Sequence, residues 1–226
     1  MGSPRLIDYH LHTAVTIDCN MNESQVCARA LEMDMAEIAF TNHVMLTQPN
    51  YCVSPAAFTA HWKQIQECQS HNPDLKIRLG IEMDYYPGRE SEIAATLQSY
   101  EDLVGRPFDI VLGAIHDLNG EFFSNKKIAP SFYARHDLLA LYHDYFSVSI
   151  AAVQSGLFDV IAHPDLIKKY THELTPYVPF EHYRTAVEPF IEALLISGVG
   201  IEVNTKGCSI KVGEMYPSNE FLELYL

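Results

Sequence analysis

Short apolar runs recur along the chain, and each one ends in a polar residue. They span residues 5–12, 36–43, 75–82, 108–116, 158–165 and 198–204. The runs are nearly continuous in apolar residues and rich in Ile and Val, which is typical of strands buried on both faces. We therefore predict a strand in each run.

Amphipathic stretches separate these runs and predict helices. The predicted helices cover residues 23–33, 55–70, 90–100, 135–154 and 180–197, and a further helix begins near Pro217. Connections of helix length imply that neighbouring strands are parallel and form right-handed βαβ units. The alternation predicts an α/β fold, either a barrel or an open doubly wound sheet.

The residues that close the runs favour a barrel with one shared site. They are His12, His43, Glu82, His116, His163 and Asn204. In a parallel barrel the carboxyl ends of all strands meet on one rim, where active sites are built. Strand ends of metal-ligand type on one rim predict a common metal site.

The segment "DYHLHT" places Asp8, His10 and His12 at alternate positions. On a strand, alternate side chains point to the same face. Two imidazoles and a carboxylate suit Zn²⁺, Fe²⁺ or Mn²⁺. The competing interpretation is a pair of exposed histidines at a sheet edge.

Three further residues end strongly apolar runs. Glu82 lies where a strand leaves the core, and its two oxygens allow it to bridge two cations; a surface glutamate is the alternative. His116 and His163 follow the runs "VLGAI" and "DVIA", and Pro164 marks an abrupt turn. Each alone is also compatible with a hydrogen-bonded structural histidine.

The remaining candidates are weaker. His43 is suited to a further metal, and Asp18 follows His12 by six residues in the first loop, where a surface aspartate is the commoner outcome. The other histidines fall in predicted helices or polar loops, and we predict that they are solvated: His61, His71, His136, His143, His172 and His182.

Length and charge narrow the class of protein. A chain of 226 residues is compatible with a single domain over residues 1–226. A net charge of −14 argues against binding of long nucleic acids, which need clustered Lys and Arg. Without a long uncharged apolar run or a basic N-terminal segment, the sequence predicts neither a membrane span nor a signal peptide. No oligomeric state is predicted.

The number and spacing of the cysteines indicate the redox state of the compartment in which the protein works. The five cysteines form no CxxC pair and are odd in number. A reduced, cytoplasmic protein fits this usage better than a disulfide scaffold does.

Several segments together resemble the polymerase-and-histidinol-phosphatase (PHP) superfamily, and more narrowly its histidinol-phosphate phosphatase branch. They are "DYHLHT", "FTNH", "LGIEMDYYPG", "VLGAIHDLNG", "IAHPDLIKKY" and "IEVNTKG…GEMYPSNEFL". The match runs from Leu6 to the chain end, in the same order and with compatible spacing. It is far more specific than a single short motif.

The resemblance implies a distorted (β/α)7 TIM-like barrel that holds up to three divalent ions, Zn, Fe or Mn. The first ion would be bound by His10 and His12. Glu82 would bridge it to a second ion held by His116 and His163. The third ion would be bound by Asp18 and His43. Asp8 and Asn204 would lie behind the ligands and orient them.

The activity implied is metal-dependent hydrolysis of a small phosphomonoester, with L-histidinol phosphate as the expected substrate and histidine synthesis as the expected pathway. Asp165 matches a position where the family places an acid near the leaving group. Two alternatives stay open: a phosphoesterase acting on a nucleotide or another small phosphate ester, and a metal-binding barrel without catalysis.

This chain departs from the family pattern at two positions, one that bears on the substrate and one that lies next to the proposed metal ligands. The branch usually reads "NTxGLRK", with an Arg that can grip phosphate, whereas this chain reads "NTKGCSIK" with Ser209 at that position. Lys206 or Lys211 would partly substitute, although an ammonium lacks the bidentate fork of Arg. Asn42 stands where the family often has Asp, which removes a charge behind the ligands.

A third departure is at the end of the chain. The family's last motif, an Asp-x-His, should follow the helix that begins near Pro217, but the chain stops at Leu226. We therefore expect a PHP domain that is incomplete at its C-terminus and lacks the last strand and helix. Either the chain is truncated, or it is a natural variant with an incomplete cluster and weak or no activity.

Overall fold

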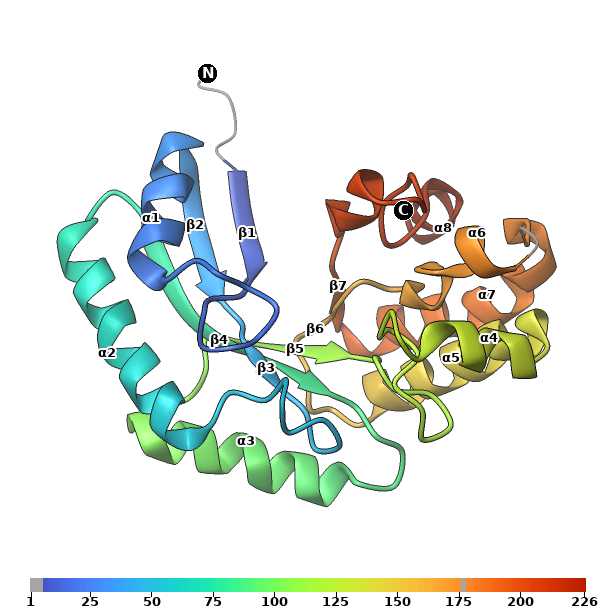
Figure 1. The fold of residues 1–226 in the computed structure, drawn as a ribbon, viewed down its shortest axis with the longest axis horizontal. Coiled ribbons are helices and arrows are strands. Elements are labelled where there is room, and N and C mark those ends of the chain that lie inside the picture. Colours follow the sequence, from blue (N-terminus) through green and yellow to red (C-terminus); the bar gives the residue numbers. More distant parts are fainter. Residues whose placement is uncertain (1–5, 176–177) are drawn as a thin grey trace. The chain divides into compact units, whose positions relative to one another are not determined.

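The computed structural model describes residues 6–175 and 178–226, and it divides into two compact units (Figure 1). Unit 1 consists of Met1–Asp84 and Ser91–Leu112, and unit 2 consists of Tyr85–Glu90 and Gly113–Leu226. Among the described residues, every helix is too short or too polar to cross a membrane.

Unit 1 is built on parallel strands. The strands β1 (Leu6–Leu11), β2 (Met35–Phe40) and β4 (Lys76–Asp84) lie in the order β1-β2-β4. The short strand β3 (His43–Val44) pairs in parallel with the end of β4, with His43 opposite Glu82. Leu11 is opposite Phe40, and Phe40 is opposite Leu79, so β1 and β2 end level with each other while β4 continues past them to Asp84. This register gathers the side chains that follow the strands.

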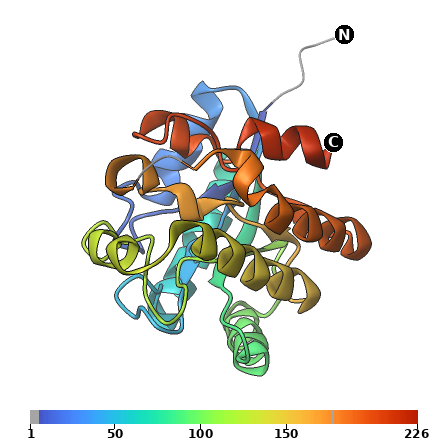
Figure 2. The same cartoon turned by 90° about the vertical axis from the view of Figure 1, so that its right-hand side faces the viewer.

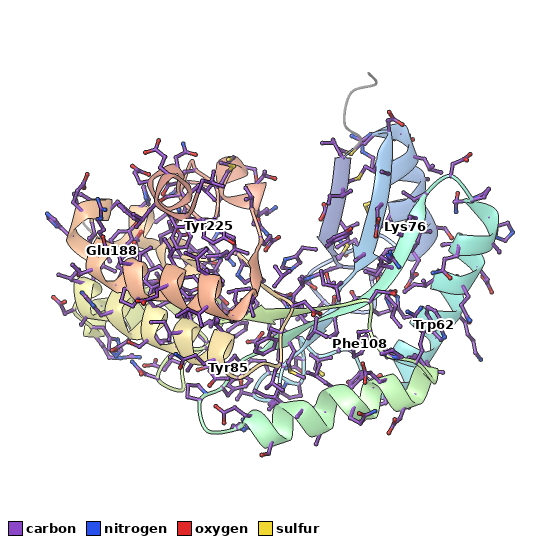
Figure 3. All side chains as sticks on the ribbon, turned by 180° about the vertical axis from the view of Figure 1, so that it is seen from behind. Trp62, Lys76, Tyr85, Phe108, Glu188 and Tyr225 are labelled. Atoms are coloured by element: carbon purple, nitrogen blue, oxygen red, sulfur yellow. The ribbon has the colours of Figure 1, made fainter. Side chains whose placement is uncertain are left out.

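Helices α1 (Glu23–Glu32), α2 (Pro55–His71) and α3 (Glu90–Val104) complete this part of the chain. Asn22 and Gln25 form a capping box at the start of α1, and Ser54 caps α2 with a proline at the next position. Phe58 of α2 packs against Phe108 with ring centroids 6.0 Å apart; Figure 3 labels Phe108 and Trp62, a second aromatic residue of α2.

Unit 2 contains the end of β5 (Ile110–Ala114) and the parallel strands β6 (Val160–Ile161) and β7 (Gly200–Ile201). Ala162 N donates to Gly113 O at 2.9 Å, which joins β5 to the chain after β6. A Cβ on Gly113 would lie 2.5 Å from the Phe158 ring, so this close approach requires glycine.

The helices of unit 2 are α4 (Ala129–Arg135), α5 (Leu138–Gln154), α6 (Thr171–Leu174), α7 (Phe180–Ser197) and α8 (Asn219–Tyr225), with 3₁₀ turns η1 (Leu166–Lys168) and η2 (Thr205–Ser209). α5 and α7 run side by side (Figure 2), and Tyr142 stacks on Tyr183 with centroids 4.1 Å apart. Buried apolar side chains of both helices contribute to the core of unit 2.

The predicted α/β fold with parallel strands is confirmed, and the predicted helices exist, with two differences in detail. The helix predicted over residues 135–154 is two helices, because the Asp137 side chain accepts from Ala140 N at 2.9 Å and starts a new one. The strand predicted over residues 36–43 is also divided: β2 ends at Phe40, Thr41 N donates to Leu11 O at the end of β1, and the Asn42 side chain accepts from Thr13 N in the first loop.

A candidate metal centre

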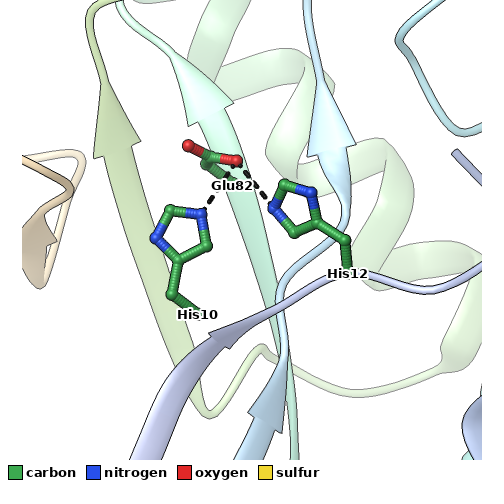
Figure 4. A group of neighbouring side chains, drawn as sticks. All are labelled: His10, His12 and Glu82. Atoms are coloured by element: carbon green, nitrogen blue, oxygen red, sulfur yellow. Dashed lines mark ion pairs between the residues drawn. The ribbon is translucent and has the colours of Figure 1, made fainter. Parts of the chain in front are cut away.

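Two histidines and a carboxylate meet at the carboxyl end of the unit 1 sheet. His10 Nε2 lies 3.2 Å and His12 Nε2 lies 3.0 Å from Glu82 Oε2 (Figure 4). The two histidines share a face because they alternate along the chain at the end of β1. Glu82 comes from β4, and none of its surface is exposed.

A second group adjoins the first. His12 Nδ1 lies 2.5 Å from Asp18 Oδ2, and His43 Nε2 lies 3.4 Å from the same oxygen. The other nitrogen of His43, Nδ1, lies 2.7 Å from Glu82 Oε2. The imidazoles of His12 and His43 therefore each span the gap between the two carboxylates. An oxygen of Asp84 is within 4.8 Å of His43 and joins the group.

The donor atoms fit a divalent metal ion. In the sets His10–His12–Glu82 and His12–Asp18–His43, one ligand atom from each residue lies within 4.8 Å of the others. Ligands at ~2.0–2.1 Å from a tetrahedral Zn²⁺ are separated from one another by roughly 3.3 Å. The nitrogen–oxygen separations of 3.0 and 3.2 Å around Glu82 match that spacing. Imidazole and carboxylate are also the ligand types that Zn, Fe and Mn accept.

The electrostatics of this group favour a cation. Burial acts to raise the pKa of Glu82, but the charges of His43 and His10 outweigh it and hold the pKa well below its usual range. For His43, burial acts to lower the pKa, and the Glu82 carboxylate outweighs it and raises the pKa to about 10. The same carboxylates that retain a proton on His43 attract a metal ion, so protons and metal compete for these atoms.

In unit 2, His116 and His163 lie close together after β5 and β6. Their ring centroids are 4.9 Å apart, and both residues are buried. His163 adopts a left-handed backbone with φ of 31°, and its N–H donates to Glu202 Oε2 at 2.6 Å. The two predicted ligands of the second ion thus form a pair; that Glu82 bridges their ion stays a prediction.

The predicted acid, Asp165, is fully buried in unit 2. Its Oδ2 accepts from Lys168 Nζ at 2.9 Å and from Ser218 N at 3.0 Å. Burial raises the pKa of Asp165 to about 7, and the Lys168 charge opposes this rise. Lys168 is itself buried and also donates to Met215 O at 2.8 Å. The carboxyl group is therefore fixed in orientation through Oδ2, whereas Oδ1 has no hydrogen-bond partner among the described residues.

Of the two residues predicted to orient ligands, Asp8 contacts a ligand directly and Asn204 reaches one through Glu202. Asp8 Oδ1 accepts from the backbone N–H of His10 at 2.9 Å. Asn204 Nδ2 donates to Glu202 Oε1 at 2.8 Å, and the other oxygen of Glu202 accepts from His163. Asn204 therefore reaches His163 through a glutamate that the sequence analysis did not single out.

The two lysines predicted to bind phosphate lie on or near η2. Lys206 is exposed. Lys211 has a side chain that is 71% exposed and lies 3.4 Å from Glu173. Both are accessible to an anion, and their role stays a prediction.

One prediction was wrong. His61 is not solvated: it is 2% exposed, with Nδ1 bonded to Glu23 and Nε2 3.1 Å from Asn42 Nδ2. Its position carried a signal, because the residues at positions 58, 61, 65 and 68 follow a helical apolar period and are all buried. The other five histidines of that group are exposed or half-buried.

A PHP domain family model matches residues 8–206. The chain belongs to the PHP family. The resemblance inferred from the motifs is thereby confirmed. Among relatives of this PHP protein, one from Deinococcus radiodurans named "Probable histidinol-phosphatase" is 28% identical over 229 residues, which cover 96% of this chain and 80% of the relative.

Solved structures share the fold. A protein of Listeria monocytogenes proposed to be a histidinol phosphatase superposes with a TM-score of 0.83 at 18% identity, covering 97% of this chain and 90% of that one. Histidinol phosphate phosphatase of Lactococcus lactis, crystallised with zinc, L-histidinol and phosphate, gives a TM-score of 0.78 at 21% identity over 97% and 80% of the two chains.

Proposed function

We propose that this PHP protein is a metal-dependent phosphomonoester hydrolase that converts L-histidinol phosphate and water to L-histidinol and phosphate. The observation that carries the proposal is the group of imidazoles around the buried Glu82 carboxylate. The named relatives and the zinc, L-histidinol and phosphate in the Lactococcus lactis structure support the metal and the substrate.

The ligands are assigned as follows. His10 and His12 hold one ion with Glu82, and His43 and Asp18 hold another. Asp18 also fixes the proton of His12: a hydrogen on Nδ1 donates to the Asp18 carboxylate and leaves the Nε2 lone pair directed toward Glu82. We assign a further ion to His116 and His163, whose rings adjoin in unit 2.

When bound, the divalent ions neutralise phosphoryl oxygens and lower the pKa of a coordinated water toward ~7. The remaining chemistry belongs to the chain. Asp165, held by Lys168 and Ser218, is the proposed proton donor to the departing alkoxide. Lys206 and Lys211 are the proposed phosphate-binding groups in place of the family's Arg, and each presents a single charged ammonium.

Zinc, iron and manganese all suit these ligands, and zinc is the ion we propose first because a structural relative holds it. We also propose that the protein works in a reducing, cytoplasmic compartment. All five cysteines are free, which supports this proposal.

The test compares two substrates and the metal-free protein. Zinc-loaded protein should release phosphate from L-histidinol phosphate, and removal of metal by a chelator should abolish release until zinc or manganese is restored. A 3′,5′-bisphosphonucleotide hydrolysed faster than L-histidinol phosphate would redirect the proposal to nucleotides. Full metal content with neither substrate hydrolysed would make the protein a metal-binding domain without catalysis.

A further inference from the structure

A chain of buried polar groups lies behind the metal ligands of unit 1. The Glu23 carboxylate on α1 bonds His61 Nδ1 on α2, and His61 Nε2 lies 3.1 Å from Asn42 Nδ2. Asn42 Oδ1 accepts from Thr13 N at 2.8 Å. Glu23, His61, Asn42 and Thr13 are each at most 5% exposed. The metal assignment above uses none of these residues.

The donor and the acceptor of each hydrogen bond in this series can be assigned. Thr13 N is a backbone donor, so the Asn42 atom that faces it must be the acceptor oxygen Oδ1. The amide nitrogen of Asn42 then faces His61 Nε2, which must be the acceptor of that pair. His61 is therefore a neutral imidazole with its hydrogen on Nδ1, donated to the Glu23 carboxylate.

Two members of this hydrogen-bonded series are next in sequence to a proposed ligand. Thr13 directly follows His12, and Asn42 directly precedes His43. Asn42 Oδ1 is the acceptor for Thr13 N, so one amide fixes the first loop to the connection between β2 and β3. His61 in turn fixes that amide, because its Nε2 accepts from the Asn42 side chain.

We propose that Glu23, His61 and Asn42 form a positioning relay that sets the distance between His12 and His43 and so determines the metal affinity of unit 1. This inference rests on the metal site of the proposed function. If the acceptor nitrogen of His61 is removed, one N–H of the buried Asn42 amide loses its partner, and only the 3.3 Å bond to Thr13 Oγ1 holds that nitrogen. The amide is then free to rotate, and Thr13 N loses its acceptor. The two ligands then lose their common anchor, and small displacements of ligands weaken a metal site strongly.

Two variants at one position separate positioning from packing. His61→Gln places an oxygen near the former Nε2 and keeps an acceptor for Asn42. His61→Asn places an amide near the former Nδ1 and keeps the donor to Glu23, but it removes the acceptor nitrogen that faced Asn42 Nδ2. Asn72→Ala is the matched control, since it removes the side-chain bond to Cys68 O, 2.8 Å long, at the other end of α2.

The readout is zinc affinity, measured by competition with a chromophoric chelator, together with the melting temperature of the metal-free protein. We expect His61→Asn to bind zinc at least tenfold more weakly than the parent and His61→Gln to bind within threefold of it. Asn72→Ala should lower the melting temperature and leave zinc affinity unchanged.

Three results would overturn the relay: equal zinc affinity in His61→Asn and the parent, equal loss in both His61 variants that follows their melting temperatures, or no zinc binding by the parent. Because no phosphate ester is used, failure of the proposed function is recognised separately, as a parent protein that binds zinc and releases no phosphate from L-histidinol phosphate.

Discussion

Glu82 lies at the end of β4 with no exposed surface, and nitrogens of His10, His12 and His43 lie within 3.2 Å of its Oε2. An isolated charge buried in this way would cost several kcal/mol. Neutral imidazoles would offer this carboxylate only lone pairs or single N–H donors, so the compensating positive charge comes from a proton held by His43 or from a metal ion. Without a bound cation, the buried Glu82 carboxylate would therefore lower the stability of the folded protein.

Replacing this carboxylate should remove metal as well as activity. Glu82→Gln keeps the shape but loses the charge, so we expect at least one fewer ion per chain and a loss of phosphatase rate of 100-fold or more. Elemental analysis and phosphate release measure the two effects. Glu32→Gln, in the exposed pair with Arg29, serves as control and should match the parent. Full metal content in Glu82→Gln would contradict the assignment.

The Glu23–His61 contact should also make folding depend on pH. Burial acts to raise the pKa of Glu23, and the hydrogen bond from His61 outweighs it and lowers the pKa below the ordinary value. A lowered folded-state pKa adds stability that is present above the unfolded pKa of about 4.3 and is lost as pH falls through the folded pKa.

Chemical denaturation of the metal-free parent and of Glu23→Gln between pH 6 and pH 3 measures this effect. The parent should be the more stable at pH 6, and the difference should shrink as the pH falls through the acidic range. A difference that stays constant across this range would show that the Glu23 charge contributes nothing.

The existence and order of the helices and strands could be predicted from the sequence, but the points at which they are interrupted could not. Strong apolar periods with clear caps gave α2 and α7 nearly to the residue. The break between α4 and α5 depends on Asp137, whose side chain accepts a hydrogen bond from a backbone N–H and so caps a new helix. A polar residue within an amphipathic pattern can also lie on the exposed face of a continuous helix, so the sequence alone does not predict this break. β6 and β7 each span only two residues, although hydrogen bonds continue past them: Ala162 N donates to Gly113 O, and Glu202 N donates to Ile161 O.

The candidate site divides in the same way. His10, His12, His43 and Glu82 were predictable because strand ends gather ligands, whereas Asp18, in a loop, was implied by the family resemblance. The structure brings these five residues together in unit 1. Glu23, His61 and Glu202 were not, because each acts through a neighbour that is distant in sequence. An acidic first turn on α1 and a histidine on α2 each have an ordinary explanation until the two helices are packed together.

Close packing of β5 gives a prediction at the scale of elements. Gly113→Ala would put a methyl group 2.5 Å from the Phe158 ring, so we expect a loss of roughly 1–3 kcal/mol in the free energy of unfolding. Urea denaturation measures it. The double variant with Phe158→Leu should recover part of the loss, whereas equal stability of Gly113→Ala and the parent would refute the close approach.

For the whole molecule, charge and metal are coupled. The chain has a net charge of −14, and part of that charge converges on the buried ligand group in unit 1. A ligand that binds only the folded state stabilises it by about 2.7 kcal/mol when present at 100 times its dissociation constant. Bound ions also offset acidic repulsion, which a small anionic substrate would otherwise meet.

Removal of metal should therefore lower stability as well as activity. We expect a chelator to lower the melting temperature of the protein and added zinc to restore it, measured by calorimetry. Glu82→Gln should show a smaller response to zinc than the parent. An unchanged melting temperature on chelation, with zinc released into solution, would argue that the ions do not distinguish folded from unfolded chains.

Ser218 has two tasks in unit 2. Its N–H donates to Asp165 Oδ2 at 3.0 Å, and its hydroxyl accepts from Phe221 N at 3.3 Å to begin α8. Helix α8 contains no proposed ligand, yet Ser218 at its start is hydrogen-bonded to Asp165, the group proposed to protonate the leaving alkoxide. Cleavage of the backbone just before residue 219 would leave all the proposed ligands named above in place but would loosen the contact that holds Asp165. We therefore expect such a cut to lower the rate of phosphate release while zinc stays bound.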